Sequence, residues 1–71
     1  MVRLRVLEIL KEQGRSKYWL HKRMGGISYQ NFNSMVENKT SSVKYENLDR
    51  MSDLLNCSVG DLFEKTNAPM H

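Results

Sequence analysis

Residues 16–39 read SKYWLHKRMGGISYQNFNSMVENK, and this stretch decides the fold. Ser16 and Ser28 each precede a helix-forming segment, where a hydroxyl accepts hydrogen bonds from the free N–H groups of the first turn. The two adjacent glycines between the segments end the first one, because a left-handed backbone turn costs little only for glycine. We therefore predict a helix over residues 17–24, a glycine turn, and a second helix over residues 28–38.

Each of these two helices has an apolar side. Phe32, Met35 and Val36 recur at positions i, i+3 and i+4 of the second helix, which is the spacing of a buried stripe. Leu20 and Met24 have the same spacing in the first helix. The pattern predicts that both helices pack on one small core.

The rest of the chain predicts three more short helices. One spans about residues 5–13, although alternating apolar residues before it also allow an extended start; another spans about residues 46–55. Ser58, with an acid three residues later, begins the last one. The predicted inward residues of the last two helices are Leu48, Met51, Leu55, Val59, Leu62 and Phe63. We expect a compact all-α domain of five helices over residues 1–66, followed by a loose tail over 67–71.

Length and composition exclude several classes of protein. Seventy-one residues make one small domain, and the single cysteine, Cys57, excludes an intramolecular disulfide. His21 and His71 do not complete a zinc ligand set, so we expect no metal and no cofactor. No run approaches the roughly 18 apolar residues of a membrane span. These features indicate a soluble, cytoplasmic protein with no membrane partner and no small-molecule substrate.

The two parts of the chain carry opposite charge. Residues 1–44 hold nine Lys and Arg against three acids, a net +6. Residues 45–71 hold two against five acids, a net −3. A polyanion is attracted by the first part and repelled by the second, although charge alone is equally typical of a solvated surface.

The outward face of the second helix has the chemistry of a base-reading surface. No charge occurs in residues 28–34, whereas a merely solvated helix face is usually rich in Lys and Glu. Asn and Ser are poor helix formers, which indicates a surface selected for recognition. Gln30 and Asn31 are able to bond adenine edges in the major groove. The candidate base-reading residues are Tyr29, Gln30, Asn31, Asn33 and Ser34.

These residues give the chain a family resemblance. Through Ser16-Lys-Tyr-Trp-Leu20, Gly26-Ile-Ser-Tyr-Gln-Asn-Phe32 and Glu37-Asn-Lys-Thr40, it resembles the Cro/CI-type (lambda-repressor-like, XRE family) helix-turn-helix domains. Ser58-Val-Gly-Asp-Leu-Phe63 supports the likeness, which covers about residues 5–64. The resemblance implies a transcriptional regulator that binds duplex DNA as a homodimer, often a small phage or mobile-element repressor.

The chain departs from the family pattern in two places. The turn holds two glycines, Gly25 and Gly26, where the family usually has one. The fifth position of the first motif helix is His21, where a small residue usually lets the helices cross closely. We expect a changed crossing of the two helices, with His21 a satisfied helix residue and not a ligand.

Phosphate contacts should flank the second helix. Lys17 stands where the family places a backbone contact, and the residues after the second helix are placed to grip the opposite strand. The candidate phosphate-contacting residues are Lys17, Ser28, Lys39, Thr40 and Lys44. Trp19 has two interpretations: packing on the flank of the core, which we favour, or a contact with phosphate or a partner.

Three other functions compete. An enzyme is disfavoured, because no nucleophile–base pair, metal cluster or phosphate loop occurs in the sequence. A protein-interaction module of antirepressor or antitoxin type fits the acidic second part and the apolar Leu54, Phe63 and Met70. Sequence-independent nucleic-acid packing is a third alternative, in which lysines matter and amides do not.

Overall fold

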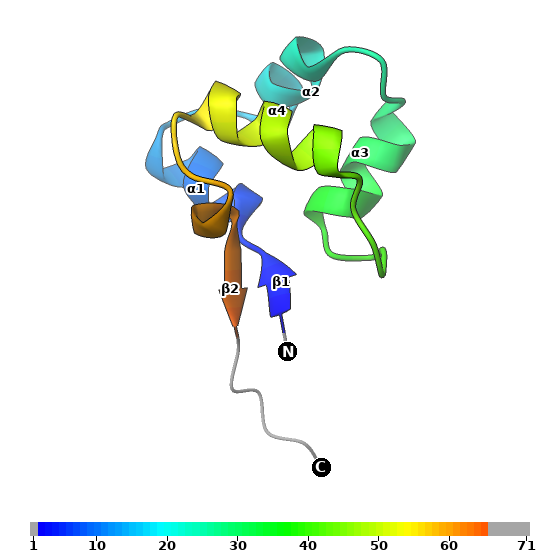
Figure 1. Cartoon of the computed structure of the whole chain (residues 1–71). Helices are drawn as coiled ribbons and strands as arrows, with labels where there is room; N and C mark the ends of the chain where they lie inside the picture. Colours follow the sequence, from blue (N-terminus) through cyan, green and yellow to red (C-terminus); the bar gives the residue numbers. More distant parts are fainter. Residues whose placement is uncertain (1, 66–71) are drawn as a thin grey trace.

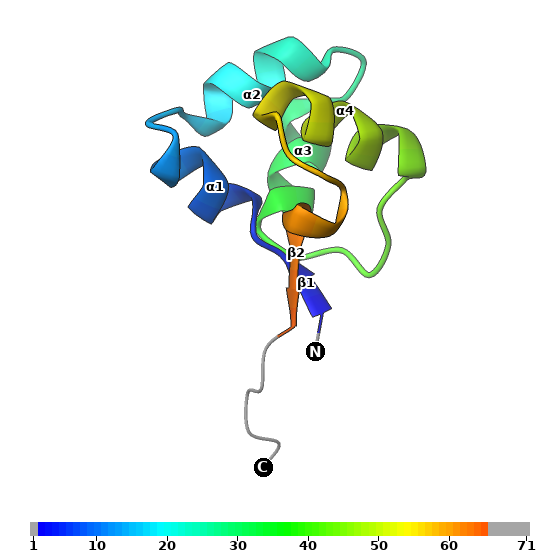
Figure 2. The ribbon, with the colours of Figure 1, turned by 60° about the vertical axis from the view of Figure 1, so that its left-hand side comes forward.

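Figure 1 shows a computed structural model of the chain, which describes residues 2–65. The elements in chain order are β1 (Val2–Leu4), α1 (Val6–Glu12), α2 (Lys17–Met24), α3 (Tyr29–Val36), α4 (Tyr45–Leu55), the 3₁₀ turn η1 (Gly60–Leu62) and β2 (Phe63–Lys65). The four α-helices gather at one end of the molecule and the two strands form a ribbon at the other (Figures 1 and 2). The predicted tail over 67–71 lies outside the described residues.

The helix-turn-helix unit begins as the sequence predicts. α2 has the predicted bounds, and α3 starts directly after Ser28. However, α3 ends at Val36, two residues before the predicted end, because Asn38 has a left-handed φ of 62° that no helix can contain. α4 starts one residue earlier than predicted and ends where Asn56, at φ 56°, turns the chain, as the sequence suggested.

The prediction of five helices is wrong. Ser58 and Asp61 do form the predicted cap, since the Ser58 Oγ accepts from the Asp61 N–H at 3.2 Å. The helix nevertheless stops after the single 3₁₀ turn η1, and the chain continues as β2. The physical reason is a competing partner: β1 offers β2 an antiparallel ladder, with Val2 opposite Lys65.

The ribbon also decides which residues of the last predicted helix are buried. Leu62 is fully buried as predicted, and its carbonyl accepts from the Arg5 N–H at 2.8 Å. Phe63 packs on the core from a strand and not from a helix. Val59 was predicted to point inward but is 39% exposed. Residues 2–65 therefore form four helices closed by a two-stranded ribbon.

One apolar core joins all these elements. The predicted stripe of α3 is confirmed, since Phe32, Met35 and Val36 are buried. The other buried apolar residues are Leu4, Val6, Ile9, Leu10, Leu20, Met24, Met51, Leu55 and Leu62. Leu48 and Leu54 of α4 are half-buried against this core. Because α3 contributes three of its eight residues to the core, its opposite side is free for other contacts.

Cys57 is half-buried beside the core, and this burial, followed by the nearby charge of Asp61, raises the pKa of its thiol. Among residues 2–65, no group of three His, Cys, Asp or Glu side chains is arranged to hold a metal ion. No helix within the same range is long and apolar enough to cross a membrane.

Candidate nucleic-acid interface

Serine caps define the start of both motif helices. The Ser16 Oγ accepts a hydrogen bond from the Trp19 N–H at 3.0 Å, and the Ser28 Oγ accepts from the Asn31 N–H at 3.2 Å. Each bond satisfies one of the N–H groups that a helix leaves free at its start. Ser28 is exposed, and its hydroxyl hydrogen is not used by the cap. The Ser28 hydroxyl can therefore cap α3 and donate its hydrogen to a phosphate, as predicted, at the same time.

The first turn of α3 presents three of the predicted base-reading residues. Tyr29, Gln30 and Asn31 are all exposed, while Ser34, one turn further along, is half-buried. Their side chains offer a phenol, two amides and a hydroxyl, which are the donors and acceptors that read base edges. Tyr29 lies on the side toward α2, where its ring contacts that of His21, and Asn31 and Ser34 lie on the side toward α4.

Asn33 and Lys17 lie differently, because each is bonded to the other. The Lys17 Nζ donates to Asn33 Oδ1 at 2.8 Å and pairs with Glu37 Oε2 at 3.0 Å. Asn33 and Glu37 are one turn apart on α3 and face α2, so this bridge links the two helices. The hydrogen bond from Lys17, its charge and that of Lys39 lower the pKa of the Glu37 carboxyl. In this state the bridge occupies both a predicted base-reading residue and a predicted phosphate contact.

A groove of about 330 Å³ runs beside α3, between it and the start of α4. Asn31 and Ser34 line it from α3, and Thr40 and Lys44 line it from the connecting loop. Ser28 also lines the groove, so three predicted phosphate contacts and two predicted base-reading residues share it. Lys39 is exposed at the end of α3 and does not line the groove.

His21 bridges the two motif helices. Its ring lies 5.2 Å from that of Tyr29 in an edge-on arrangement and 5.3 Å from that of Phe32. Its Nε2 lies 2.9 Å from the Ile27 carbonyl, and since a carbonyl only accepts, this nitrogen carries the hydrogen. His21 is a satisfied helix residue, as predicted. The bulky ring fills the place of the family's small residue and becomes part of the α2–α3 contact.

Trp19 is half-buried against the core, on the flank of α2 away from His21. The guanidinium carbons of Arg15 and Arg23 lie 4.0 and 4.7 Å from its ring centroid. The indole therefore packs on the core and carries two cations on its surface, an arrangement in which the quadrupole of the ring attracts each charge. The interpretation of Trp19 as a flank-packing residue is confirmed.

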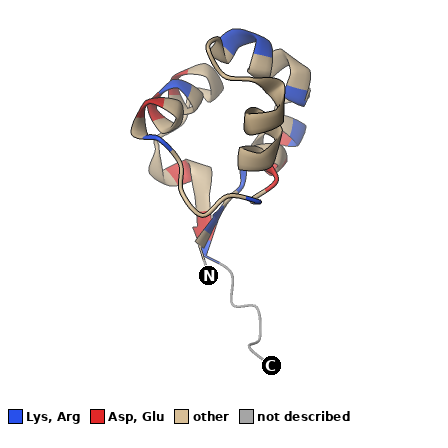
Figure 3. Ribbon diagram, turned by 90° about the vertical axis from the view of Figure 1, so that its right-hand side faces the viewer, with Lys and Arg blue, Asp and Glu red and all other residues tan. Residues whose placement is uncertain are grey.

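α3 contains no charged residue, whereas the elements around it do. Figure 3 shows blue segments on α2 and an uncharged α3, with both signs on α4. Glu46, Asp49 and Asp53 repeat at i, i+3 and i+7 along the exposed side of α4. A polyanion that approaches α3 from the α2 side meets cations, and one that approaches over α4 meets acids.

Sequence analysis missed Glu37 and Asn38, the two residues that end α3. Glu37 completes the Lys17 bridge, and the amide of Asn38 bonds both backbone groups of Leu4. The position of Glu37, one helical turn after Asn33, could have indicated that both residues face the same neighbour. Asn38 had one too, because asparagine directly after a helix often takes the left-handed conformation.

The comparison with known families agrees with this geometry. The family model described as a Cro/C1-type HTH DNA-binding domain matches residues 4–67. Neither a curated protein nor a solved structure matches the chain at a significant level. The family is one of DNA-binding domains and is typically non-enzymatic. Because the match covers nearly the whole sequence, the chain belongs to the Cro/C1-type helix-turn-helix DNA-binding domains.

Proposed function

We propose that this domain is a sequence-specific transcriptional regulator, a small bacterial repressor of phage or mobile-element type that reads the major groove with α3. The observation that carries the proposal is the exposed, uncharged first turn of α3, with Gln30 and Asn31 beside Tyr29. A major groove admits one helix, and an amide side chain there bonds adenine through its donor and acceptor together. Gln30 and Asn31 have this role in the proposal.

In this arrangement one phosphate strand follows the α3 and loop side of the groove, because Glu46 lines the α4 side and repels phosphate. Thr40 and Lys44 supply a hydroxyl and an ammonium along its wall, and the exposed Lys39 extends the contact beyond the end of α3. Lys17 contacts the DNA only if its ammonium leaves the Glu37 carboxylate and pairs with a phosphate oxygen instead. Its partner Asn33 is released in the same step and becomes able to reach a base.

We further propose that the domain, over residues 1–66, acts in the cytoplasm as a homodimer. One α3 covers too few base pairs for useful discrimination, so two copies on a repeated site are required. This proposal is independent of the base contacts, and the length of the protected DNA tests it: protection of a single half-site would contradict it.

The deciding experiment is selection of bound sequences from a random DNA pool, followed by binding measurements at two salt concentrations. Gln30→Ala and Asn31→Ala should reduce the preference for the selected sequence over a scrambled duplex by about 1–3 kcal/mol each. Lys44→Ala should weaken binding to both duplexes and lower the salt slope by about one. Lys65→Ala, an exposed charge change on β2 and outside the α2–α3 unit, is the matched control. A pool that yields no enriched sequence contradicts the proposed function.

A second candidate function is a protein-interaction module, and the exposed acidic row of Glu46, Asp49 and Asp53 favours it. The apolar surface that first suggested it is smaller than expected, because Leu54 and Phe63 pack against the core. Met70 lies outside the described residues. Capture of a stoichiometric protein partner that Asp49→Lys abolishes, with no enriched DNA sequence, would favour this alternative.

A further inference from the structure

The end of α3 is fixed to the ribbon by one side chain. After Val36 the chain turns at Asn38, whose φ is 62°. The Asn38 N–H donates to the Met35 carbonyl at 3.1 Å, and the Lys39 N–H donates to the Ser34 carbonyl at 2.8 Å. These bonds close the last turn of α3 and direct the amide of Asn38 toward β1.

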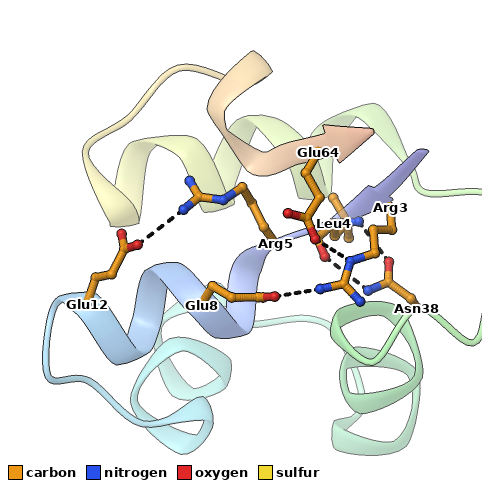
Figure 4. A network of polar contacts seen from close by, with 7 residues as sticks. All are labelled: Arg3, Leu4, Arg5, Glu8, Glu12, Asn38 and Glu64. Atoms are coloured by element: carbon orange, nitrogen blue, oxygen red, sulfur yellow. Dashed lines mark hydrogen bonds and ion pairs between the residues drawn. The ribbon is translucent and has the colours of Figure 1, made fainter. Parts of the chain in front are cut away.

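The Asn38 amide makes the two hydrogen bonds to Leu4 of β1 that a third strand would otherwise make. The Leu4 N–H donates to Asn38 Oδ1 at 2.8 Å, and Asn38 Nδ2 donates to the Leu4 carbonyl at 3.0 Å (Figure 4). Leu4 lies opposite Phe63 in the ladder, and successive residues of a strand direct their backbone groups to opposite edges. The two groups of Leu4 that Asn38 bonds therefore occupy the β1 edge remote from β2.

Only asparagine meets both demands of this position. The residue must adopt a left-handed backbone, which asparagine tolerates better than other residues with side chains. Its side chain must also donate and accept at once, which among short side chains only an amide does with two separate atoms. Leu4 is 3% exposed, whereas Asn38 is exposed, so the buried partner of these two bonds is the backbone of Leu4.

The ribbon to which Asn38 is fixed is itself held in place. Arg3, adjacent to Leu4, pairs with Glu64 across the ribbon and with Glu8 of α1 (Figure 4). At the other end of α3, His21 bonds the Ile27 carbonyl and contacts Tyr29. Polar contacts thus hold α3 at its end through Asn38, along its α2 side through Lys17, and just before its start through the Ile27 carbonyl.

We propose that Asn38 is a positioning residue for α3: its paired hydrogen bonds to Leu4 set the rotation and tilt at which the helix presents Gln30 and Asn31. The proposal rests on the proposed function, since it assigns a role in base reading to a residue that does not face the reading surface. Loss of the amide should impair discrimination between sequences and should leave the charge-driven attraction to any duplex unchanged.

The test uses Asn38→Gly, which keeps the left-handed turn at no steric cost and removes only the amide. Asn38→Asp is the second variant, since its carboxylate accepts from Leu4 but cannot donate to it. The matched control is Gln13→Ala, which removes a 2.8 Å hydrogen bond between Gln13 Nε2 and the Leu55 carbonyl, away from α3. Binding to the selected and scrambled duplexes is measured at a temperature where circular dichroism shows every variant folded.

Both Asn38 variants should lose about tenfold in the ratio of the two affinities, the equivalent of one bidentate base contact. Affinity for the scrambled duplex and its salt slope should stay within about twofold of wild type, and Gln13→Ala should keep the ratio. A ratio unchanged in Asn38→Gly, or lost equally in Gln13→Ala, overturns the proposal.

Failure of the proposed function is distinguishable from failure of this inference. If the wild type itself prefers no sequence, the proposed function fails, and amide hydrogen exchange of the free protein decides the inference. Asn38→Gly should then accelerate exchange across α3 by about tenfold more than across α2. Equal acceleration in the two helices overturns the positioning role.

Discussion

Replacing His21 by alanine should destabilise the domain, even though a small residue is usual at this position of the family. Two ring contacts disappear, with Tyr29 and Phe32, each contributing about 0.5–1 kcal/mol. The bond from Nε2 to the Ile27 carbonyl contributes about 1 kcal/mol. The expected loss in the free energy of unfolding is therefore about 2–3 kcal/mol, which for a domain of this size lowers the melting temperature by roughly 10–20 °C.

Two further variants separate the contributions. His21→Phe keeps a ring and loses the donor, whereas His21→Gln keeps an N–H donor and loses the ring. Each should lose about half of the alanine effect in urea unfolding followed by circular dichroism. Lys22→Ala, at the next and exposed position of α2, provides the baseline for the loss of a surface side chain. If His21→Ala falls within about 0.5 kcal/mol of this control, the argument that His21 joins the two helices is refuted.

Three other perturbations follow from the described geometry. The hydrogen bond from Lys17, then its charge, holds the pKa of Glu37 below its ordinary 4.5, so the contribution of Glu37 to stability is complete above that pH and is lost as pH falls through the lowered value. Glu37→Gln should flatten the pH dependence of the urea midpoint in that window, and an unchanged slope would contradict the pairing. Gly25→Ala should cost about 1–3 kcal/mol in the same unfolding assay, because φ 61° and ψ 154° are strained for any side chain although no atom lies within 4 Å of the added carbon; a loss below about 0.5 kcal/mol would argue against this turn. Burial raises the pKa of the Cys57 thiol, so mass spectrometry should show slower alkylation than for free cysteine at about pH 8, and equal rates would place the thiol in solvent.

The helix-turn-helix unit was predictable because its signals are local. A serine hydroxyl before each helix, two glycines after the first one and a three-residue apolar stripe in the second each act within one or two turns of chain. Ser16 and Ser28 accept the predicted type of bond, and the stripe is buried. The base-reading and phosphate roles of the exposed residues stay predictions, because a site for DNA is defined by a partner as well as by the chain.

The errors arise where a distant segment competes with a local signal. Ser58 and Asp61 form the local cap that favours a helix, but the partner that diverts the following residues into β2 is β1, at the other end of the described chain. The bond between Asn33 and Lys17 of the preceding helix is a second pairing between separate elements, and the base-reading role of Asn33 stays a prediction. Neither pairing is visible in a window of a few residues.

The ribbon has a consequence for the order in which the domain folds. Arg3 and Glu64 are 61 residues apart in sequence, so their pairing closes almost the whole described chain into one loop. Compared with a loop of about 15 residues, a loop this long costs about 1.2 kcal/mol more in chain entropy, and the ribbon should form after the helices that lie between its strands. Changes in the ribbon should therefore accelerate unfolding and leave the folding rate almost unchanged. On a ribosome, β1 and the four helices of the described chain precede β2, so β1, to which Asn38 bonds, gains its paired strand only when the last described residues have emerged.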